Sequence, residues 1–322
     1  MAGIRMHSKD TVHFVTNRCH QERLLLLPDD TINFIIGYWF ARALDRFGQG
    51  LEIYGFIFLS NHFHLLCKDT KGTLARFMGY FQGNLAKTVN EIRGGRKGKF
   101  WAREYDDMIV DDDDNAFLNR YAYLLANPAK AGLVNRASEW IGWSSLDAAL
   151  TGARFEFSSV NRTKLHNATR RNQKVDESDF VETYGFELTV PPMWEGKPQE
   201  EIAELTQELV KSAEVEYGRR RDNKPALGVE HIRSQSPFDR PVDPSFRPRI
   251  KFFALTRERV RKLLGGYRVF VGNYKTQMGG FLKAAMLQRP SLVEWPVGSY
   301  PPSSNLPVGN GVWTGDDIRA AA

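Results

Sequence analysis

The chain has 322 residues, 42% of them hydrophobic, which is enough to bury a core and long enough for two domains. Its formal charge of +6 and pI near 9.2 give a modest preference for polyanionic partners. No apolar run reaches the roughly 18 residues of a membrane span, and the N-terminus lacks a signal-peptide segment. We therefore expect a soluble protein with no membrane partner, in the cytoplasm or nucleoid.

The first strand and helix of the pattern lie before residue 50. Apolar and polar residues alternate over 11–18, as in a strand, and an apolar stripe at helical spacing runs through 29–47. Next come two apolar runs, 51–59 and 62–67, separated only by Ser60 and Asn61. Such a short connection predicts an antiparallel hairpin.

A second α-β-α stretch completes the first 150 residues. Its apolar spacing predicts a helix over 72–92, a flexible basic loop over 94–99, a strand near 107–110 and a helix from about 115 to 126. The helix at 115 follows the acidic run 111–114, which we interpret as carboxylates stabilising its N-terminus. The order of elements predicts an α+β fold, a ferredoxin-like antiparallel sheet with helices on it.

The second half of the chain is less regular. Residues 158–200 show no sustained periodicity, a helix is clear over 199–218, and a helix over 255–285 is expected to break at Gly265-Gly266. The tail from about 296 is rich in Pro, Gly and Ser, a composition typical of poor order. We predict domains at 1–150 and 151–322, the second a mostly helical or irregular basic extension of unknown role. Its balance of 26 basic to 21 acidic residues and the run Arg219–Arg221 suit accessory DNA binding, and a structural or partner-binding extension is an equal alternative.

Two histidines stand one residue apart in the apolar run Phe58–Leu66. On a strand, His62 and His64 point to one face while Phe63 and Leu65 point to the other. Two imidazoles on one face can share a divalent metal, although a bare His-x-His is more often a pair of core residues. Cys67 would lie on the opposite face, so it makes a poor third ligand.

A tyrosine and an asparagine are four residues apart near the end of the predicted helix at 115–126. Tyr123 and Asn127 therefore share one helical face. Tyr121 is a rival nucleophile, but its spacing of six residues from Asn127 turns it about 240° away at roughly 100° per residue. Asn127 also precedes Pro128 and has an alternative role in ending the helix.

Basic and aromatic residues alternate after the second long helix. Such a mixture suits a charged backbone with bases that stack, and it also suits a solvated loop beside a buried Trp. The candidate DNA-binding residues are Arg93, Arg96, Lys97, Lys99 and Arg103.

Together these motifs resemble those of a known family. The His-x-His strand, the segment FWAREYDDMIV, and then NRYAYLLANPAKAGLV and WIGWSS are similar to the REP-associated tyrosine transposase branch of the HUH single-tyrosine transposases. The resemblance covers about residues 10–148 and is specific as a set rather than motif by motif.

The resemblance implies a site and a reaction. His62, His64 and Asn127 would hold Mg²⁺ or Mn²⁺, and Tyr123 would attack single-stranded DNA beside a hairpin to form a 5′-phosphotyrosine. The expected function is a metal-dependent endonuclease and strand-transferase, with single-stranded DNA hairpins as partners and a homodimer as the expected assembly.

Two other functions are compatible with the same residues. One is a domesticated hairpin-DNA-binding protein with little or no cleavage. The other is an unrelated metallohydrolase, which would need a further strong ligand; His13 and His20 could approach the pair only through the fold.

Overall fold

The computed structural model describes residues 4–6, 11–171, 175–222, 224–240, 250–286 and 294–299. Its strands are β1 (Val12–Arg18), β2 (Leu51–Leu59), β3 (His62–Asp69), β4 (Asp106–Val110), β5 (Phe155–Val160), β6 (Val181–Phe186) and β7 (Phe252–Phe253). Its helices are α1 (Asp30–Phe47), α2 (Leu74–Ile92), α3 (Asp114–Leu125), α4 (Asn127–Lys130), α5 (Leu146–Thr151), α6 (Arg162–Arg170), α7 (Gln199–Arg220), α8 (Val229–Ser234) and α9 (Arg257–Met286).

The main sheet has the order β2-β3-β1-β4-β7. Its first four strands are antiparallel, and β1 lies between β3 and β4. With α1 between β1 and β2, and α2 between β3 and β4, this is the ferredoxin-like α+β arrangement, which confirms the predicted fold class. β7, from the second half of the chain, extends the sheet by pairing with β4 in parallel.

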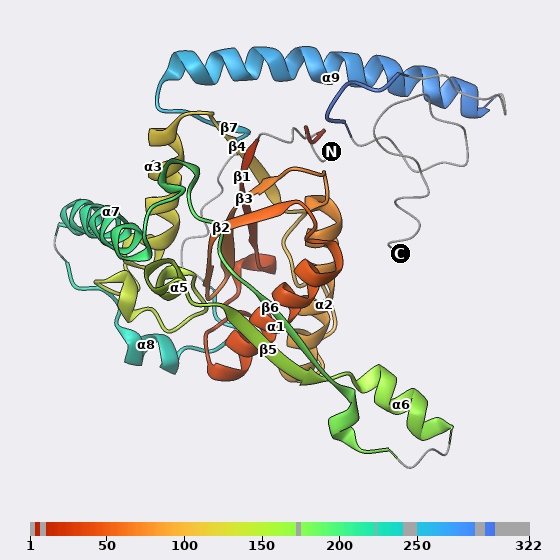
Figure 1. The fold of residues 1–322 in the computed structure, drawn as a ribbon, viewed down its shortest axis with the longest axis vertical. Helices are drawn as coiled ribbons and strands as arrows, with labels where there is room; N and C mark the ends of the chain where they lie inside the picture. The colour runs from red at the N-terminus through yellow and green to blue at the C-terminus, as the bar shows by residue number, and fades with distance from the viewer. Residues whose placement is uncertain are drawn as a thin grey trace.

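Helices cover both faces of this sheet (Figure 1). On one face, α1 and α2 form a core with Phe63, Leu65 and Cys67 of β3. On the other face, α3, α5 and α7 form a second core that includes Leu66. Since side chains alternate along a strand, the face of β3 that carries Leu66 also carries His62 and His64.

Carboxylates cap two of these helices. Asp29 accepts a hydrogen bond from the Ile32 amide (2.7 Å), and Asp113 accepts one from the Ala116 amide (2.8 Å). The interpretation of the acidic run as a helix N-terminus is therefore confirmed at Asp113. Asp111, in the same run, instead accepts two hydrogen bonds from Arg259 of α9, at 2.9 and 2.7 Å.

A β-hairpin lies at the start of the second half of the chain, although residues 158–200 show no sustained periodicity. β5 and β6 pair antiparallel, and Phe157 packs directly over Gly37 of α1. The aromatic residues of the hairpin join the core between α1 and the sheet, with Phe155 and Phe186 stacked at 5.0 Å. The hairpin continues beyond the body and carries α6 at its far end (Figure 1).

The predicted break at Gly265-Gly266 is also wrong, because α9 is continuous from Arg257 to Met286. Tyr267, directly after the glycine pair, packs against Phe252 at 5.7 Å and donates a hydrogen bond to the Ile4 carbonyl. These contacts offset the low helix propensity of glycine. The predicted helix over 199–218 corresponds to α7, and the tail beyond residue 299 lies outside the described residues.

Within the described ranges, no helix combines the length and the apolar character needed to cross a bilayer.

Candidate functional site

The two histidines of β3 meet on the face of the sheet that α3 covers. Arg18 and Leu59 flank His62 in the sheet, and Thr16 and Ile57 flank His64. The centroids of the two imidazole rings are 5.1 Å apart and the rings are nearly perpendicular. This is the arrangement that the two-residue period of a strand predicts.

Tyr123 reaches this pair from α3. Its ring lies 5.6 Å from the His64 ring and 5.7 Å from the Phe14 ring, measured between centroids. Tyr121, by contrast, is 1% exposed and packs against Trp194 at 5.9 Å. Burial raises the pKa of Tyr121, which further disfavours it as a nucleophile.

Asn127 joins the site through Tyr123. It is the first residue of α4, directly after the bend at Ala126 that ends α3, and it is 3% exposed. Its side-chain amide interacts with the Tyr123 hydroxyl and lowers the pKa of that tyrosine. The residue that precedes Pro128 therefore starts a new helical turn and still lies beside Tyr123.

Lys130 and Arg120 place positive charge beside Tyr123. The Lys130 Nζ lies 4.1 Å from the centre of the Tyr123 ring, and the Arg120 guanidinium carbon lies 4.7 Å from it. Burial by itself raises the pKa of Tyr123, but Lys130, the Asn127 amide and Arg120 outweigh burial and lower that pKa from its ordinary value. Our sequence reasoning missed Lys130, although its spacing of seven residues from Tyr123 was a usable signal.

The buried environment keeps His64 neutral. Burial, followed by the positive charges of its neighbours, lowers the pKa of His64 well below its ordinary value. Its Nδ1 is buried and makes no hydrogen bond within the described part of the chain. A neutral imidazole with an unpartnered nitrogen is a competent metal ligand.

His62 is oriented by a neighbouring amide. Asn61 donates from Nδ2 to the Glu22 carbonyl (3.1 Å), which turns its Oδ1 toward the Nδ1 of His62 at 2.6 Å. Since an amide oxygen only accepts, Nδ1 of His62 is the donor in this contact. Partners of this kind orient metal-binding histidines.

The donor set fits a divalent ion of low affinity. Two imidazoles and an amide oxygen leave coordination positions for phosphate and water. Among the described residues, no group of three or more His, Cys, Asp or Glu side chains could hold a metal. His13 does not supply a further ligand, because it stands opposite Cys67 in the sheet and therefore points to the other face from His64.

The predicted basic cluster is only partly available to a ligand. Arg93 contacts Asp29 at 3.3 Å, and Arg103 pairs with Asp106 at 2.6 Å. Arg96 bonds to the side chain of Asn90, whereas Lys97 and Lys99 are exposed.

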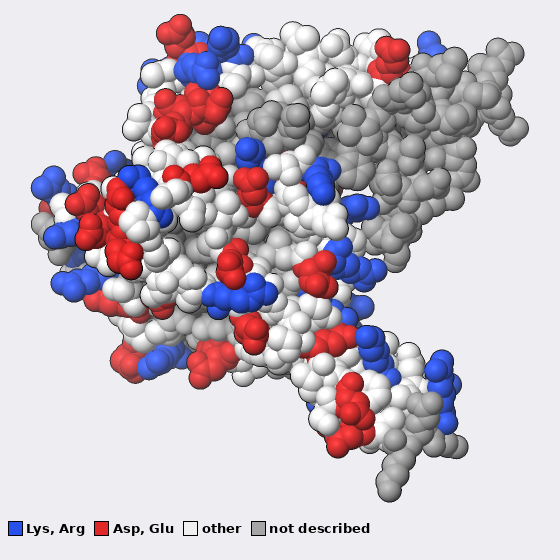
Figure 2. Space-filling view, viewed as in Figure 1, with Lys and Arg blue, Asp and Glu red and all other residues white. Residues whose placement is uncertain are grey.

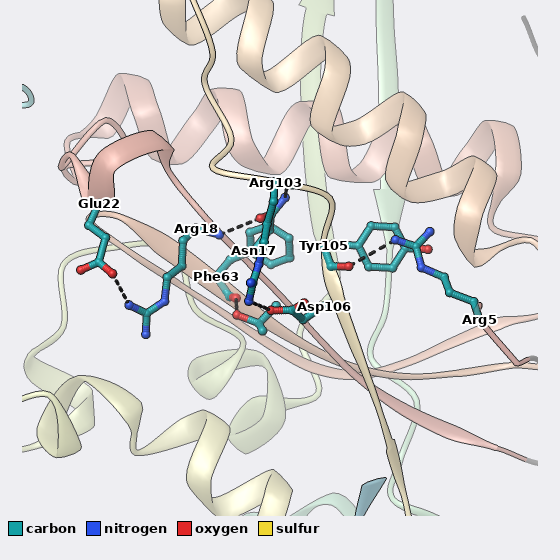
Figure 3. Close-up of polar contacts among 9 residues, drawn as sticks. Arg5, Asn17, Arg18, Glu22, Phe63, Arg103, Tyr105 and Asp106 are labelled. Carbon is teal, nitrogen blue, oxygen red and sulfur yellow. Dashed lines mark hydrogen bonds and ion pairs between the residues drawn. The ribbon is translucent and has the colours of Figure 1, made fainter. Parts of the chain in front are cut away.

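The chain around Arg103 is hydrogen-bonded to the C-terminal end of β1 (Figure 3). Asn17 donates to the Arg103 carbonyl at 3.1 Å, and Arg5 donates to the Tyr105 carbonyl at 3.2 Å while stacking on that ring. Arg18, next to His62 in the sheet, pairs with Glu22 at 2.9 Å.

The second half of the chain braces the tyrosine helix. α7 packs along α3 and α4, and Arg221, just after it, donates to the Ala129 carbonyl of α4 at 3.0 Å. Glu214 of α7 accepts from the Ala137 amide at 2.6 Å. Residues from both halves therefore fix the position of Tyr123 and Asn127.

Solved structures of transposases are distantly similar to this chain. No family model and no curated protein matches the chain. Among solved structures, a REP-associated tyrosine transposase bound to a REP hairpin is similar at 16% identity and a TM-score of 0.39, covering 47% of this chain and 85% of that one. A proposed transposase from Deinococcus radiodurans R1 is similar at 16% identity and a TM-score of 0.28, covering 38% of this chain and 95% of that one. Likenesses this distant carry no functional argument, so the assignment depends on the site.

Proposed function

We propose that this protein is a metal-dependent, single-stranded DNA endonuclease and strand-transferase of the REP-associated single-tyrosine transposase type. The observation that carries the proposal is the cluster of one tyrosine with two histidines. The ring centroid of Tyr123 lies 5.6 Å from that of His64, which in turn lies 5.1 Å from that of His62, and Asn127 lowers the pKa of the same tyrosine. Residues 1–150 contain these groups, and α7 from the second half of the chain packs against the helices that carry Tyr123 and Asn127.

In the proposed reaction, Tyr123 is the nucleophile. Its phenolic oxygen attacks the scissile phosphorus after losing its proton to solvent, a P–O bond to Tyr123 forms, and the bond to the 3′ oxygen breaks. That oxygen takes up a proton and leaves as a 3′-hydroxyl, while the 5′-phosphate stays on Tyr123. The phosphotyrosine conserves the energy of the broken bond, so another 3′-hydroxyl can reverse the step and join strands.

The residues around Tyr123 have distinct roles in this proposal. Lys130, Arg120 and the amide of Asn127 stabilise the phenolate. His62, His64 and Asn127 would hold Mg²⁺ or Mn²⁺. When bound, such an ion would polarise a non-bridging oxygen of the scissile phosphate.

Adduct formation tests the proposal. Purified protein is incubated with Mn²⁺ and labelled single-stranded hairpins from the DNA flanking its gene, and covalent adducts are resolved on denaturing gels. We expect an adduct with the wild type and with Tyr121→Phe, the matched control, and none with Tyr123→Phe or His64→Ala. Hairpin binding without any adduct would instead favour the domesticated DNA-binding protein.

A further inference from the structure

The helix α9 concentrates positive charge. From Arg259 to Met286 it contains six Lys and Arg residues and no Asp or Glu. Arg259 is committed to Asp111 at the start of the helix. The remaining cations are exposed to solvent: Arg261, Lys262, Arg268, Lys275 and Lys283.

Most of these cations fall on one stripe. At about 100° per residue, Arg257, Arg261, Arg268, Lys275 and Lys283 lie within about 80° of one another around the helix axis. The central three follow each other every seven residues, a separation of about 10.5 Å at a rise of about 1.5 Å per residue. The stripe is therefore a straight row of charge rather than a diffuse cloud.

Glycines occupy the positions between the cations. Gly265, Gly272 and Gly279 lie on the same stripe, and a Cβ added at any of them would meet no atom within 4 Å. Packing inside the described chain therefore does not require these glycines, even though each weakens the helix. A partner that lies close to the helix backbone would require them.

Apolar side chains on one side of α9 pack against other parts of the chain. Tyr267 packs on Phe252 at 5.7 Å, and Trp295 packs on Tyr274 at 5.1 Å and on Phe281 at 5.9 Å. A helix lying on a membrane would need this side for lipid. The basic stripe is exposed to solvent, as are Val269 and Leu282 of the same helix, and its charge favours a polyanion.

The N-terminal end of α9 lies close to the candidate active site. The Arg120 guanidinium carbon is 3.8 Å from the ring centre of Phe253 in β7 and 4.7 Å from that of Tyr123. α9 begins four residues after Phe253 and runs along the edge of the body and past it (Figure 1). DNA bound at Tyr123 can therefore reach α9 without crossing the protein.

We propose that the basic stripe of α9 binds the phosphate backbone of duplex DNA flanking the hairpin. The inference rests on the proposed function only for the identity of the polyanion as DNA. Thirty residues of helix span about 45 Å, which corresponds to about 13 base pairs of duplex. Figure 2 shows one face of the body with positive and negative side chains intermixed, in contrast to the composition of α9.

The test is a binding measurement on the full chain. It compares a bare labelled hairpin with the same hairpin carrying a duplex flank of about 20 base pairs, long enough to cover the helix. The variant combines Arg261→Gln, Arg268→Gln and Lys275→Gln. Its matched control combines Lys71→Gln, Lys87→Gln and Lys211→Gln, which remove equal charge from exposed positions outside α9. Melting curves verify that both variants fold.

We expect the α9 variant to bind the flanked hairpin about 10-fold more weakly than the control does, with the salt dependence of log Kd reduced by about 3. Binding of the bare hairpin should be the same for both variants. Equal affinities for the flanked hairpin would overturn the inference. Two further probes are a hairpin with a single-stranded flank and vesicles of anionic lipid. The inference would also be overturned if the α9 variant lost affinity for one of these probes and not for the hairpin with the duplex flank.

Adduct formation on the bare hairpin separates this inference from the proposed function. If the α9 variant forms adduct normally and binds the flanked hairpin like the control, only the α9 inference fails. If the wild type forms no adduct but its affinity for the flanked hairpin depends on α9, the enzyme assignment fails and the DNA surface stands.

Discussion

The ammonium group of Lys130 lies over the ring of Tyr123, 4.1 Å from its centre, so a fixed positive charge accompanies the candidate nucleophile. Replacing Lys130 with Gln removes a charge that lowers the pKa of Tyr123. Because attack requires the phenolate, adduct formation should rise at higher pH in the variant than in the wild type. A shift of one pKa unit corresponds to about a 10-fold lower rate near neutrality.

Lys130→Arg is the control for that prediction, since it keeps the charge. The measurement is the initial rate of adduct formation across the pH range. Identical pH profiles for Lys130→Gln and the wild type would show that Lys130 does not assist Tyr123.

Removing the metal should stop the reaction without unfolding the protein. His62 and His64 belong to a strand that is buried between two cores, so the fold does not depend on an ion at this position. We expect a chelator to abolish adduct formation, Mg²⁺ or Mn²⁺ to restore it, and Tm to change little. A chelator-induced collapse of Tm, with tightly bound zinc in the untreated protein, would instead point to the metallohydrolase.

Arg221 should matter for stability more than its neighbour Arg220. Arg221 donates to the Ala129 carbonyl of α4, whereas Arg220 is exposed and, among the described residues, pairs with Glu216 one turn earlier. Arg221→Ala should cost about 1 kcal/mol of unfolding free energy or more, and slow adduct formation because α4 carries Asn127. Arg220→Ala should cost less than about 0.5 kcal/mol. If both variants lose the same free energy of unfolding in denaturant titrations, the contact of Arg221 with Ala129 does not stabilise α4.

The pair of His13 and Asp107 makes stability depend on pH in both directions. Burial by itself lowers the pKa of His13, but the Asp107 carboxylate 2.8 Å away outweighs it and raises that pKa. Burial raises the pKa of Asp107, and His13 outweighs it and lowers that pKa. His13 therefore contributes stability below about pH 6.5 that is lost as the pH rises through its raised folded value. Asp107 contributes stability above about pH 3.9 that is lost as the pH falls through its lowered folded value.

The consequence is a stability maximum between these two limits. His13→Gln should cost about 3 kcal/mol, since it leaves a buried carboxylate without its partner, and it should abolish the decline on the alkaline side. His166→Gln, at an exposed position on α6, is the control. Unfolding free energies from urea titrations at several pH values check the prediction, and an unchanged alkaline decline in His13→Gln would contradict it.

Gly37 allows the β5–β6 hairpin to dock on α1. A Cβ at this position would lie 2.1 Å from Cζ of Phe157, so Gly37→Ala must displace that ring. We expect a loss of about 1–3 kcal/mol, partly recovered when Phe157→Ala is added. Gly79→Ala on α2 has open space and should stabilise by up to about 1 kcal/mol. Equal Tm shifts for the two alanine variants would count against this docking contact.

Local patterns predicted a large part of this protein. The two-residue period of β3 predicts that His62 and His64 share a face, and the four-residue spacing predicts the contact between Tyr123 and Asn127. The two-residue connection at Ser60 and Asn61 predicts the hairpin of β2 and β3. These features depend on residues close in the chain, so periodicity and turn chemistry are sufficient to infer them. The assignments of metal and DNA to this site stay predictions.

Only the tertiary structure decided which distant groups meet. Arg259 binds Asp111 across 148 positions, and Arg221 reaches Ala129 across 92. The glycine pair of α9 stays helical because Tyr267 is held by partners elsewhere in the chain, and Arg93 and Arg103 form ion pairs although the sequence suggested a DNA surface. Such contacts depend on how helices and strands pack against each other, and no local pattern in the sequence encodes that packing.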